Sequence, residues 1–369
     1  MSPLLLHEVH AALGARFLDR QGFEAVESYG DTTREHRFLR ESCGWIDLSY
    51  RNRLVLLGTD RAKLLHGQVT NNIKDLKPGE GCYAALVNAK AKMLADINVF
   101  ALENELLLDL EPGLAATVGP RLERFFLADD VQWVDAAPHY GLFSVQGPRS
   151  LRALESLQWV PKAPEAPFQS TSVQHPDLGM VYVMNLSRFG PTGFDVYVPT
   201  TSMAPLSELM LEAVRSQGGG PVGWSALETA RIEAGIPRYG VDMDDTILPP
   251  EAGLDERAIS YTKGCYSGQE VIARIRTYGQ VSKALRGLVL STGPADLPVP
   301  RTKLYRNGKE TGFITSVVWS PVRSETIALS YVRRENNGPG TELQVGSPDS
   351  STLARIVPLP FVGPSLAGQ

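Results

Sequence analysis

The chain has 369 residues, a length that predicts two or three domains rather than one compact core. Hydrophobic residues make up 43% of it and charged residues 21%, which is ordinary for a globular protein in water. The net charge of -5 leaves no basic excess, so we expect no direct binding of nucleic acid. No apolar stretch approaches the roughly 20 residues of a membrane span, so we expect no membrane-spanning segment.

Predicted strands and helices alternate through the first 234 residues. Apolar runs bounded by turn residues predict strands at 53–58, 81–87, 94–102, 106–110, 140–146, 180–186 and 195–198. Helical spacing predicts helices at 3–16, from a cap at Thr59 or Asp60 through Leu65, from 112 through 126, near 150–157, at 206–214 and at 224–234.

The last quarter of the chain has a different character. From Ala284 onward, short β-rich runs alternate with turns such as Asn307-Gly308, which is a good hairpin signal. This pattern predicts a separate all-β domain of about 80 residues. Mixed α+β domains followed by an all-β domain occur in many enzymes, so fold class alone does not identify the function.

Three cysteines are present, at positions 43, 82 and 265. Their spacing matches no zinc or iron–sulfur pattern, and an odd number makes no complete disulfide framework. We therefore predict no resident metal, and a reducing cytoplasm fits best. The N-terminal run Leu4-Leu5-Leu6 becomes polar too soon for a secretory signal.

The stretch from 231 to 276 is richest in residues that can carry chemistry. It contains a glycine-bracketed cysteine motif, Lys263-Gly264-Cys265-Tyr266-Ser267-Gly268-Gln269-Glu270. Nearby cations lower the pKa of a thiol from its usual value of about 8.5, so Lys263, with Arg274 and Arg276 if they fold back, favours a reactive or ligand-donating thiolate at Cys265. The alternative is a small buried hydrophobe, the usual environment of a lone cysteine. The sequence leaves both interpretations open.

Two further groups of polar residues are weaker candidates. Asp96 opens an apolar strand after the turn at 88–90, where it would either face a pocket or pair with a neighbouring lysine. The acidic run Asp242-Met243-Asp244-Asp245 lacks the spacing of a calcium loop, so we interpret it as a solvated loop rather than a cation site. No histidine lies in a recognisable partner motif for Cys265, and His66 is more typical of a helix end.

Several of these motifs, taken in order, resemble those of the glycine-cleavage T-proteins, the folate-dependent aminomethyltransferases. The segment from Glu228 to Gly235, followed by Tyr239-Gly240 and Asp242-Met243-Asp244, is similar to their Arg-Leu-Glu-Ala-Gly, Tyr-Gly and Met-Asp signature. Further counterparts lie at 35–36, 44–49, 69–72, 144–148, 312–316 and 320–321. The resemblance extends from about residue 8 to residue 360.

The motif at 263–270 resembles one branch of this superfamily. T-proteins lack it, whereas YgfZ-type proteins carry Lys-Gly-Cys-(Tyr or Phe)-x-Gly-Gln-Glu, and every position matches here. This resemblance implies a cytoplasmic protein that binds tetrahydrofolate and supports the assembly or repair of iron–sulfur proteins, including tRNA-modifying enzymes.

The resemblance also implies a fold. T-proteins have an α+β fold of three domains arranged as a cloverleaf, with two intertwined α+β domains and a C-terminal β-barrel. Transferred to this chain, the first, folate-binding domain would comprise 1–50 with 138–240. The second would comprise 51–137 with 241–280 and carry the Lys-Gly-Cys motif, and the barrel would span 284–362.

The resemblance assigns residues to two roles. The chemistry would belong to Cys265 with Lys263, supported by the other motif positions Gly264, Tyr266, Gly268, Gln269 and Glu270. Tetrahydrofolate or a one-carbon derivative would be bound by Asn88, Asp96, Arg231 and Tyr239. Cys265 would make at most a transient contact with an iron–sulfur cluster, because one thiolate cannot supply the four ligands that such clusters usually need. The implied partners are folate and iron–sulfur proteins or their assembly factors.

Three departures from the T-protein pattern argue against a conventional transferase. Ala95 stands where T-proteins have the first of two aspartates, Pro191 stands where a glutamate holds the pterin, and Leu227-Glu228 replaces Arg-Asp. Loss of one charged hydrogen bond typically costs about 1.5–3 kcal/mol, which is roughly ten- to a hundredfold in affinity. The alternatives are a folate-dependent aminomethyltransferase or demethylase that transfers one-carbon units to tetrahydrofolate, and an interaction scaffold that has lost folate.

Overall fold

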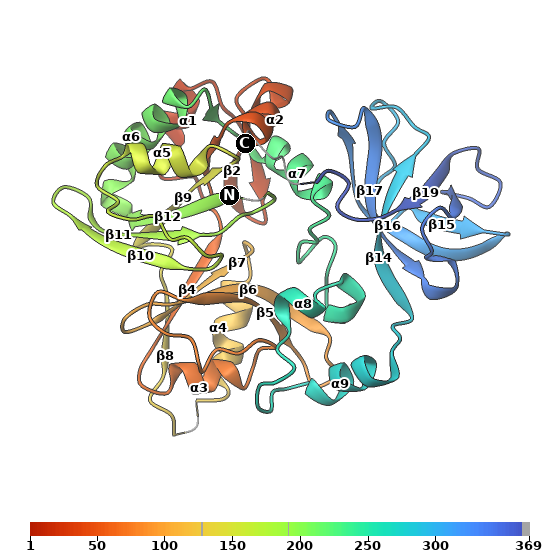
Figure 1. The fold of residues 1–369 in the computed structure, drawn as a ribbon, viewed down its shortest axis with the longest axis horizontal. Coiled ribbons are helices and arrows are strands. Elements are labelled where there is room, and N and C mark those ends of the chain that lie inside the picture. Colours follow the sequence, from red (N-terminus) through yellow and green to blue (C-terminus); the bar gives the residue numbers. More distant parts are fainter. Residues whose placement is uncertain (127, 191, 364–369) are drawn as a thin grey trace. The chain divides into compact units, whose positions relative to one another are not determined.

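The computed structural model describes residues 1–126, 128–190 and 192–363, and the chain divides into two compact units (Figure 1). Within the described residues, unit 1 comprises Met1–Ala84 and Ile97–Glu228, and unit 2 comprises Ala85–Asp96 and the chain from Thr229 to the barrel's end. Among the described helices, none is long and apolar enough to cross a membrane.

Unit 1 begins with a short helix, a hairpin and a longer helix: α1 (His7–Ala12), β1 (Arg16–Arg20), β2 (Phe23–Ser28) and α2 (Thr32–Glu41). Asp31 caps α2 because its side chain accepts a hydrogen bond from the N–H of Arg34 at 2.9 Å. The predicted helix over 3–16 is wrong at both ends. Gly14 adopts a left-handed φ of +81° just after α1, and β1 follows directly.

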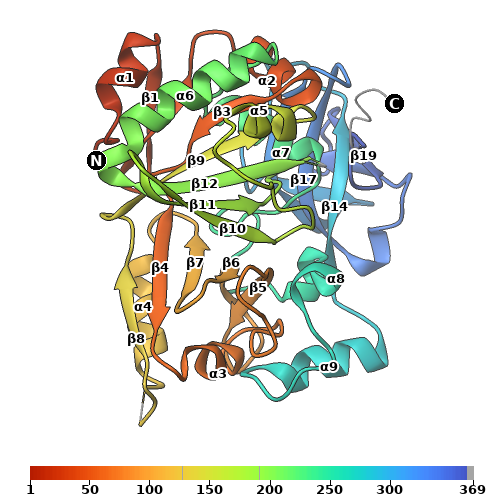
Figure 2. The ribbon, with the colours of Figure 1, turned by 60° about the vertical axis from the view of Figure 1, so that its left-hand side comes forward.

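A six-stranded sheet forms one layer of unit 1, in the order β10-β11-β12-β9-β3-β13. Its strands are β3 (Gly44–Asp47), β9 (Tyr140–Gln146), β10 (Ser170–His175), β11 (Gly179–Asn185), β12 (Gly193–Pro199) and β13 (Gly220–Pro221). Among the described strands of this sheet, only β13 pairs in parallel, with β3. Helices α5 (Ser150–Ser156) and α6 (Met203–Ser216) lie over one face, where Trp45, Phe143 and Met210 are buried in the core (Figure 2).

A second, five-stranded sheet has the order β5-β6-β7-β4-β8. Its strands are β4 (Asn52–Leu57), β5 (Gly81–Val87), β6 (Met93–Ala101), β7 (Leu106–Leu110) and β8 (Gln132–Asp135). Helix α3 (Arg61–His66) follows β4, and α4 (Ala115–Glu123) packs on β4 and β8. The side chain of Asp60 does not cap α3. It accepts a hydrogen bond from the N–H of Asp130 instead, at 3.0 Å.

Unit 2 combines short helices with a barrel. Helix α7 (Trp224–Glu233) runs from unit 1 into it, and η2 (Pro249–Ala252), α8 (Asp255–Ala258) and α9 (Gln269–Tyr278) precede the barrel. The barrel closes in the order β14-β17-β16-β15-β18-β19 and is antiparallel throughout. Its strands are β14 (Lys283–Leu290), β15 (Lys303–Arg306), β16 (Lys309–Ser320), β17 (Glu325–Arg333), β18 (Glu342–Val345) and β19 (Leu353–Val357).

The predicted α+β fold with a C-terminal β-barrel is confirmed. The division into three domains at 1–50 with 138–240, 51–137 with 241–280, and 284–362 stays a prediction. The helix predicted through 126 ends at Glu123.

Candidate functional site

All the residues that the sequence singled out for chemistry or folate lie in unit 2. The first group is the tight turn between β5 and β6. The side-chain oxygen of Asn88 accepts hydrogen bonds from the N–H groups of Lys90 and Lys92, at 2.9 and 3.1 Å. Ala91 is held in the left-handed region at φ +58°, a conformation that costs roughly 1–2 kcal/mol for a residue with a Cβ. The Asn88 side chain therefore shapes the turn, and a folate contact through it stays a prediction.

Beyond this turn, β6 presents Asp96 on its less buried side. Residues along β6 alternate between buried and half-buried, so Ala95 is buried and Asp96 is half-buried. The pKa of Tyr239 is raised to about 12, first by burial and then by the nearby carboxylates of Asp245, Asp244 and Asp96. Tyr239 thus keeps its proton at neutral pH and offers an O–H donor among carboxylate acceptors.

Asp242 is a buried carboxylate at the junction of the α7 end and the barrel. One of its oxygens accepts hydrogen bonds from the hydroxyls of Thr315 and Ser316. The other accepts from the Arg231 guanidinium at 2.8 Å and from the N–H of Arg238 at 3.1 Å. The interpretation of 242–245 as a solvated loop is therefore wrong for Asp242, which is 1% exposed, because four donors replace its water shell.

A β-bulge allows β16 to supply two of these donors. Consecutive side chains of a regular strand point to opposite faces, but the register with β17 shifts between Ile314 and Ser316. Thr315 and Ser316, although adjacent, can therefore both reach the same oxygen of Asp242.

Arg231 makes three of the hydrogen bonds at this junction. Its guanidinium donates to Asp242, to the hydroxyl of Ser316 at 2.9 Å and to the carbonyl oxygen of Ile236. These bonds join the end of α7, the following turn and the barrel wall. A contact between Arg231 and folate stays a prediction.

The cysteine motif forms the turn that leads into α9. Gly268 precedes the helix with a φ of +81°, and a Cβ at this position would lie 2.6 Å from the carbonyl oxygen of Asn88 and 2.9 Å from the Cα of Ala91. Only glycine combines this φ with such a close approach of two backbones. The motif is therefore packed directly against the turn that begins at Asn88, although the two lie far apart in sequence.

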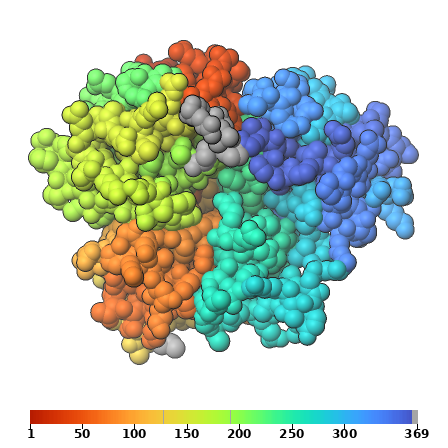
Figure 3. All heavy atoms as spheres, in the orientation of Figure 1, coloured from red at the N-terminus to blue at the C-terminus, as the bar shows by residue number. Residues whose placement is uncertain are grey.

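Cys265 is exposed on this motif, which excludes its interpretation as a small buried hydrophobe. Lys263 is buried, and its ammonium lies 4.7 Å from the centre of the Tyr266 ring. The two arginines that would reach the thiol only by folding back have other neighbours: Arg274 pairs with Glu270 at 2.9 Å, and Arg276 stacks over the ring of Tyr261 at 3.9 Å. Figure 3 shows the segment around α9 at the surface of its unit, coloured teal.

Lys92 connects the turn to the loop that follows Asp242. Its ammonium donates to the carbonyl oxygen of Thr246 at 2.7 Å and lies 3.9 Å from the carboxylate of the buried Glu251. Asp244, in the same loop, accepts from Thr246 and pairs with Arg301 at 2.8 Å. This acidic loop is thus held by side chains of its own unit.

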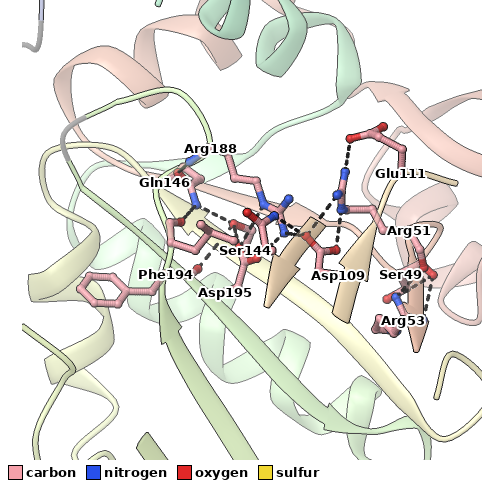
Figure 4. Close-up of polar contacts among 12 residues, drawn as sticks. Ser49, Arg51, Arg53, Asp109, Glu111, Ser144, Gln146, Arg188, Phe194 and Asp195 are labelled. Carbon is pink, nitrogen blue, oxygen red and sulfur yellow. Dashed lines mark hydrogen bonds and ion pairs between the residues drawn. The ribbon is translucent and has the colours of Figure 1, made fainter. Parts of the chain in front are cut away.

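Unit 1 contains a buried ionic network that the sequence analysis missed (Figure 4). Asp109 on β7 accepts hydrogen bonds from Arg51 at 2.7 and 3.1 Å and lies 3.0 Å from the guanidinium of Arg188. Arg188 also pairs with Asp195 on β12, and Arg51 also pairs with Glu111. The network connects the two sheets of unit 1.

The charges of this network are strongly coupled. Burial by itself would raise the pKa of Asp109, but Arg188 and Arg51 outweigh it and lower that pKa to about 2. Asp195 keeps a raised pKa, because for this carboxylate burial outweighs the pairing with Arg188. The one sequence signal was a charged residue inside the apolar strand Leu106–Leu110, whose distant partners no local pattern reveals.

Two family models match the chain, one over its α+β part and one over its barrel. Residues 6–263 match the GCVT N-terminal domain, and residues 283–363 match the glycine cleavage T-protein C-terminal barrel domain. The chain belongs to the glycine cleavage T-protein family. This is the folate-dependent aminomethyltransferase family. The altered turn of this chain includes Pro191, which lies outside the described residues.

Relatives of similar length support the family assignment. The chain is 30% identical over 368 residues to an aminomethyltransferase of Symbiobacterium thermophilum, covering 96% of each chain. It is 30% identical over 387 residues to an aminomethyltransferase of Cupriavidus metallidurans, covering 97% of this chain and 96% of the relative. The crystal structure of glycine cleavage system aminomethyltransferase T from Bartonella henselae has the same fold, with a TM-score of 0.87, 23% identity and 98% coverage of both chains.

Proposed function

We propose that this protein is a tetrahydrofolate-binding accessory factor of the YgfZ type, which supports the assembly or repair of iron–sulfur proteins, including tRNA-modifying enzymes. The observation that carries the proposal is the packing of Gly268 against the turn that begins at Asn88. Through this contact, the motif that bears the exposed Cys265 adjoins the hairpin that bears Asp96. A thiol and a candidate folate carboxylate thus belong to one unit.

The hydrogen-bonding groups around Asp96 suit a reduced pterin. A pterin ring presents several N–H groups, which need acceptors such as the carboxylate of Asp96, and Tyr239 adds a protonated hydroxyl. Asp96 and Tyr239 are therefore the residues that we assign to tetrahydrofolate or its one-carbon derivative. When bound, the folate would supply the one-carbon unit, while these two side chains orient its ring.

The role of Cys265 follows from its exposure. An exposed thiol on a backbone fixed by Gly268 and α9 is accessible to a second protein. It cannot hold an iron–sulfur cluster alone, because such clusters are usually held by four ligands. We therefore assign Cys265 to a transient contact with a client protein, its cluster or a sulfur species, with the remaining ligands supplied by the partner.

The second candidate function is a folate-dependent aminomethyltransferase or demethylase. Family membership and the names of the relatives favour it. The substitutions at Ala95, Pro191 and Leu227 argue against it, because each removes a polar group that the T-protein pattern supplies. Ala95 is fully buried among apolar residues of β6, so this position holds no carboxylate for chemistry.

Genetic complementation separates the two functions. In a strain that lacks the gene, we expect a Cys265→Ala variant to restore little methylthiolated tRNA, whereas a Cys82→Ala variant restores the wild-type level. Full rescue by Cys265→Ala would remove the thiol from the proposal. Protein levels measured in both strains exclude a folding defect as the cause.

Two measurements on purified protein complete the test. We expect calorimetry to show saturable binding of tetrahydrofolate that weakens about ten- to a hundredfold in an Asp96→Asn variant, as for loss of one charged hydrogen bond. No saturable heat would favour a scaffold without folate. Formation of 5,10-methylene-tetrahydrofolate from aminomethylated lipoyl protein or an N-methyl amine would favour the transferase.

A further inference from the structure

Unit 1 contains a cavity of about 230 Å³ that includes none of the residues assigned above to folate or to the thiol. One wall is a row of side chains in register across three strands: Val134 on β8, Val55 on β4 and Leu107 on β7. Because an apolar cavity of about 150 Å³ accommodates benzene, this one has room for a single ring with a short side chain.

Tyrosines form the facing wall. Tyr182 on β11 and Tyr197 on β12 are directly paired across their strands, and the ring of Tyr140 lies 5.8 Å from that of Tyr182. Three aromatic rings around one cavity favour a flat apolar body or an organic cation, which is attracted to the faces of such rings.

The polar groups of the cavity are few. Glu105, in the connection before β7, lines the cavity together with Tyr140 and Tyr182. Burial raises the pKa of both tyrosine hydroxyls first, and the nearby charge of Glu105 raises each further. Burial raises the pKa of Glu105 itself, partly offset by Arg61, whose guanidinium donates to the carbonyl oxygen of Gly58 at 2.7 Å. Among the described residues that line the cavity, Glu105 is the only carboxylate, His139 contributes an imidazole, and there is no lysine or arginine.

One hydroxyl in this wall lacks a partner. Tyr197 is 1% exposed, and in the described part of the chain nothing hydrogen-bonds to its hydroxyl. Leaving such a group unpaired costs free energy, about 1–3 kcal/mol in typical proteins. Burial first, and then the charges of Asp109 and Asp195, raise the pKa of this hydroxyl, which lies beside the buried ionic network of unit 1.

We propose that this cavity binds a small organic amine, with an apolar body of one ring or a short alkyl chain between the tyrosines and the aliphatic row, and with its ammonium group at the carboxylate of Glu105. The carboxylate and the aromatic faces both favour a cation, and the apolar walls exclude a strongly hydrated ligand. This site is separate from the proposed folate function.

Calorimetry on the full-length protein tests the site with matched probes. Phenethylamine carries the required ring and ammonium, 2-phenylethanol is its neutral counterpart, and phenylacetate reverses the charge. We expect saturable one-to-one binding of phenethylamine, at least tenfold weaker binding of 2-phenylethanol, and none of phenylacetate. Equal binding of the amine and the alcohol would overturn the selection for an ammonium, and no saturable binding of any probe would overturn the site.

Variants identify the residues responsible. We expect Glu105→Gln to weaken phenethylamine about ten- to a hundredfold while changing 2-phenylethanol less than twofold, as for loss of one charged contact. Glu103→Gln alters a neighbouring exposed carboxylate that does not line the cavity, so it should leave both affinities unchanged. An effect of Glu103→Gln equal to that of Glu105→Gln would contradict the assignment. Thermal melts of both variants show whether the fold is intact.

Discussion

Asp109 shows how much depends on one buried charge. Its carboxylate is fully buried and pairs with both Arg51 and Arg188. Replacing it by asparagine keeps the shape but leaves two guanidinium groups with less negative charge. Removing one partner of a buried ion pair typically costs about 3–5 kcal/mol, so we expect Asp109→Asn to lower the free energy of unfolding by that amount.

Urea unfolding at neutral pH measures this loss. The matched control is Glu310→Gln, which removes an exposed ion pair with Lys303, with a typical effect of under about 1 kcal/mol. Similar losses in the two variants would show that the buried network contributes no more than a surface pair.

The same carboxylate predicts how stability depends on pH. Because its pKa in the folded protein is about 2, below the ordinary 3.8, the folded state binds this proton less readily than the unfolded state. The resulting stabilisation, on the order of 2 kcal/mol, is complete above about pH 4 and disappears as pH falls through about 2. Between pH 5 and pH 2, the free energy of unfolding should therefore fall more steeply for the wild type than for Asp109→Asn. Parallel curves would contradict the lowered pKa.

At the scale of elements, the two glycines that flank α9 separate the cost of a left-handed φ from the cost of a steric collision. Gly268 and Gly279 both have left-handed φ values, +81° and +89°. A Cβ at Gly279 would meet no atom within 4 Å, whereas at Gly268 it would collide with the backbone of Asn88 and Ala91. We expect Gly279→Ala to cost about 1 kcal/mol from backbone strain alone and Gly268→Ala to cost at least twice that, because the hairpin must also move.

Denaturant unfolding of both variants gives the comparison. A chemical readout distinguishes local damage from general destabilisation: only Gly268→Ala should change the rate at which Cys265 reacts with a thiol reagent. Equal costs and equal rates would mean that the motif does not depend on the hairpin.

These elements show why sequence predicts some features and not others. The apolar runs that became β5, β7 and β9 were visible because burial imposes a local pattern. The sequence showed glycines on both sides of Cys265. It could not show why position 268 needs one, because the carbonyl oxygen that a Cβ would meet belongs to Asn88, far away in the chain. Asp242 was misjudged for a similar reason, because its buried position depends on Thr315 and Ser316 across the fold.

At the scale of the whole molecule, the division into two units predicts that destabilisation of one unit does not spread to the other. Asp242 lies in unit 2, where it joins the end of α7 to β16. We expect Asp242→Asn to accelerate amide hydrogen exchange in β16 and β17, while amides in β9 and β12 of unit 1 keep their wild-type rates, because local stability need not be uniform across a protein. Mass spectrometry of peptic peptides provides the measurement.

The control for this experiment is Lys303→Met, which removes an exposed barrel charge and should leave both sets of amides unchanged. Acceleration in both units by Asp242→Asn would indicate that the chain unfolds as one cooperative body.

The three thiols differ in exposure, so a reagent can label one of them selectively. Cys43 is fully buried, and burial raises its pKa to about 11, so it is almost wholly protonated at neutral pH. Cys82 is half-buried, whereas Cys265 is exposed on a backbone held by α9. A maleimide dye should therefore attach first to Cys265, where its fluorescence would report changes in the surroundings of the turn that leads into α9, without any engineered cysteine.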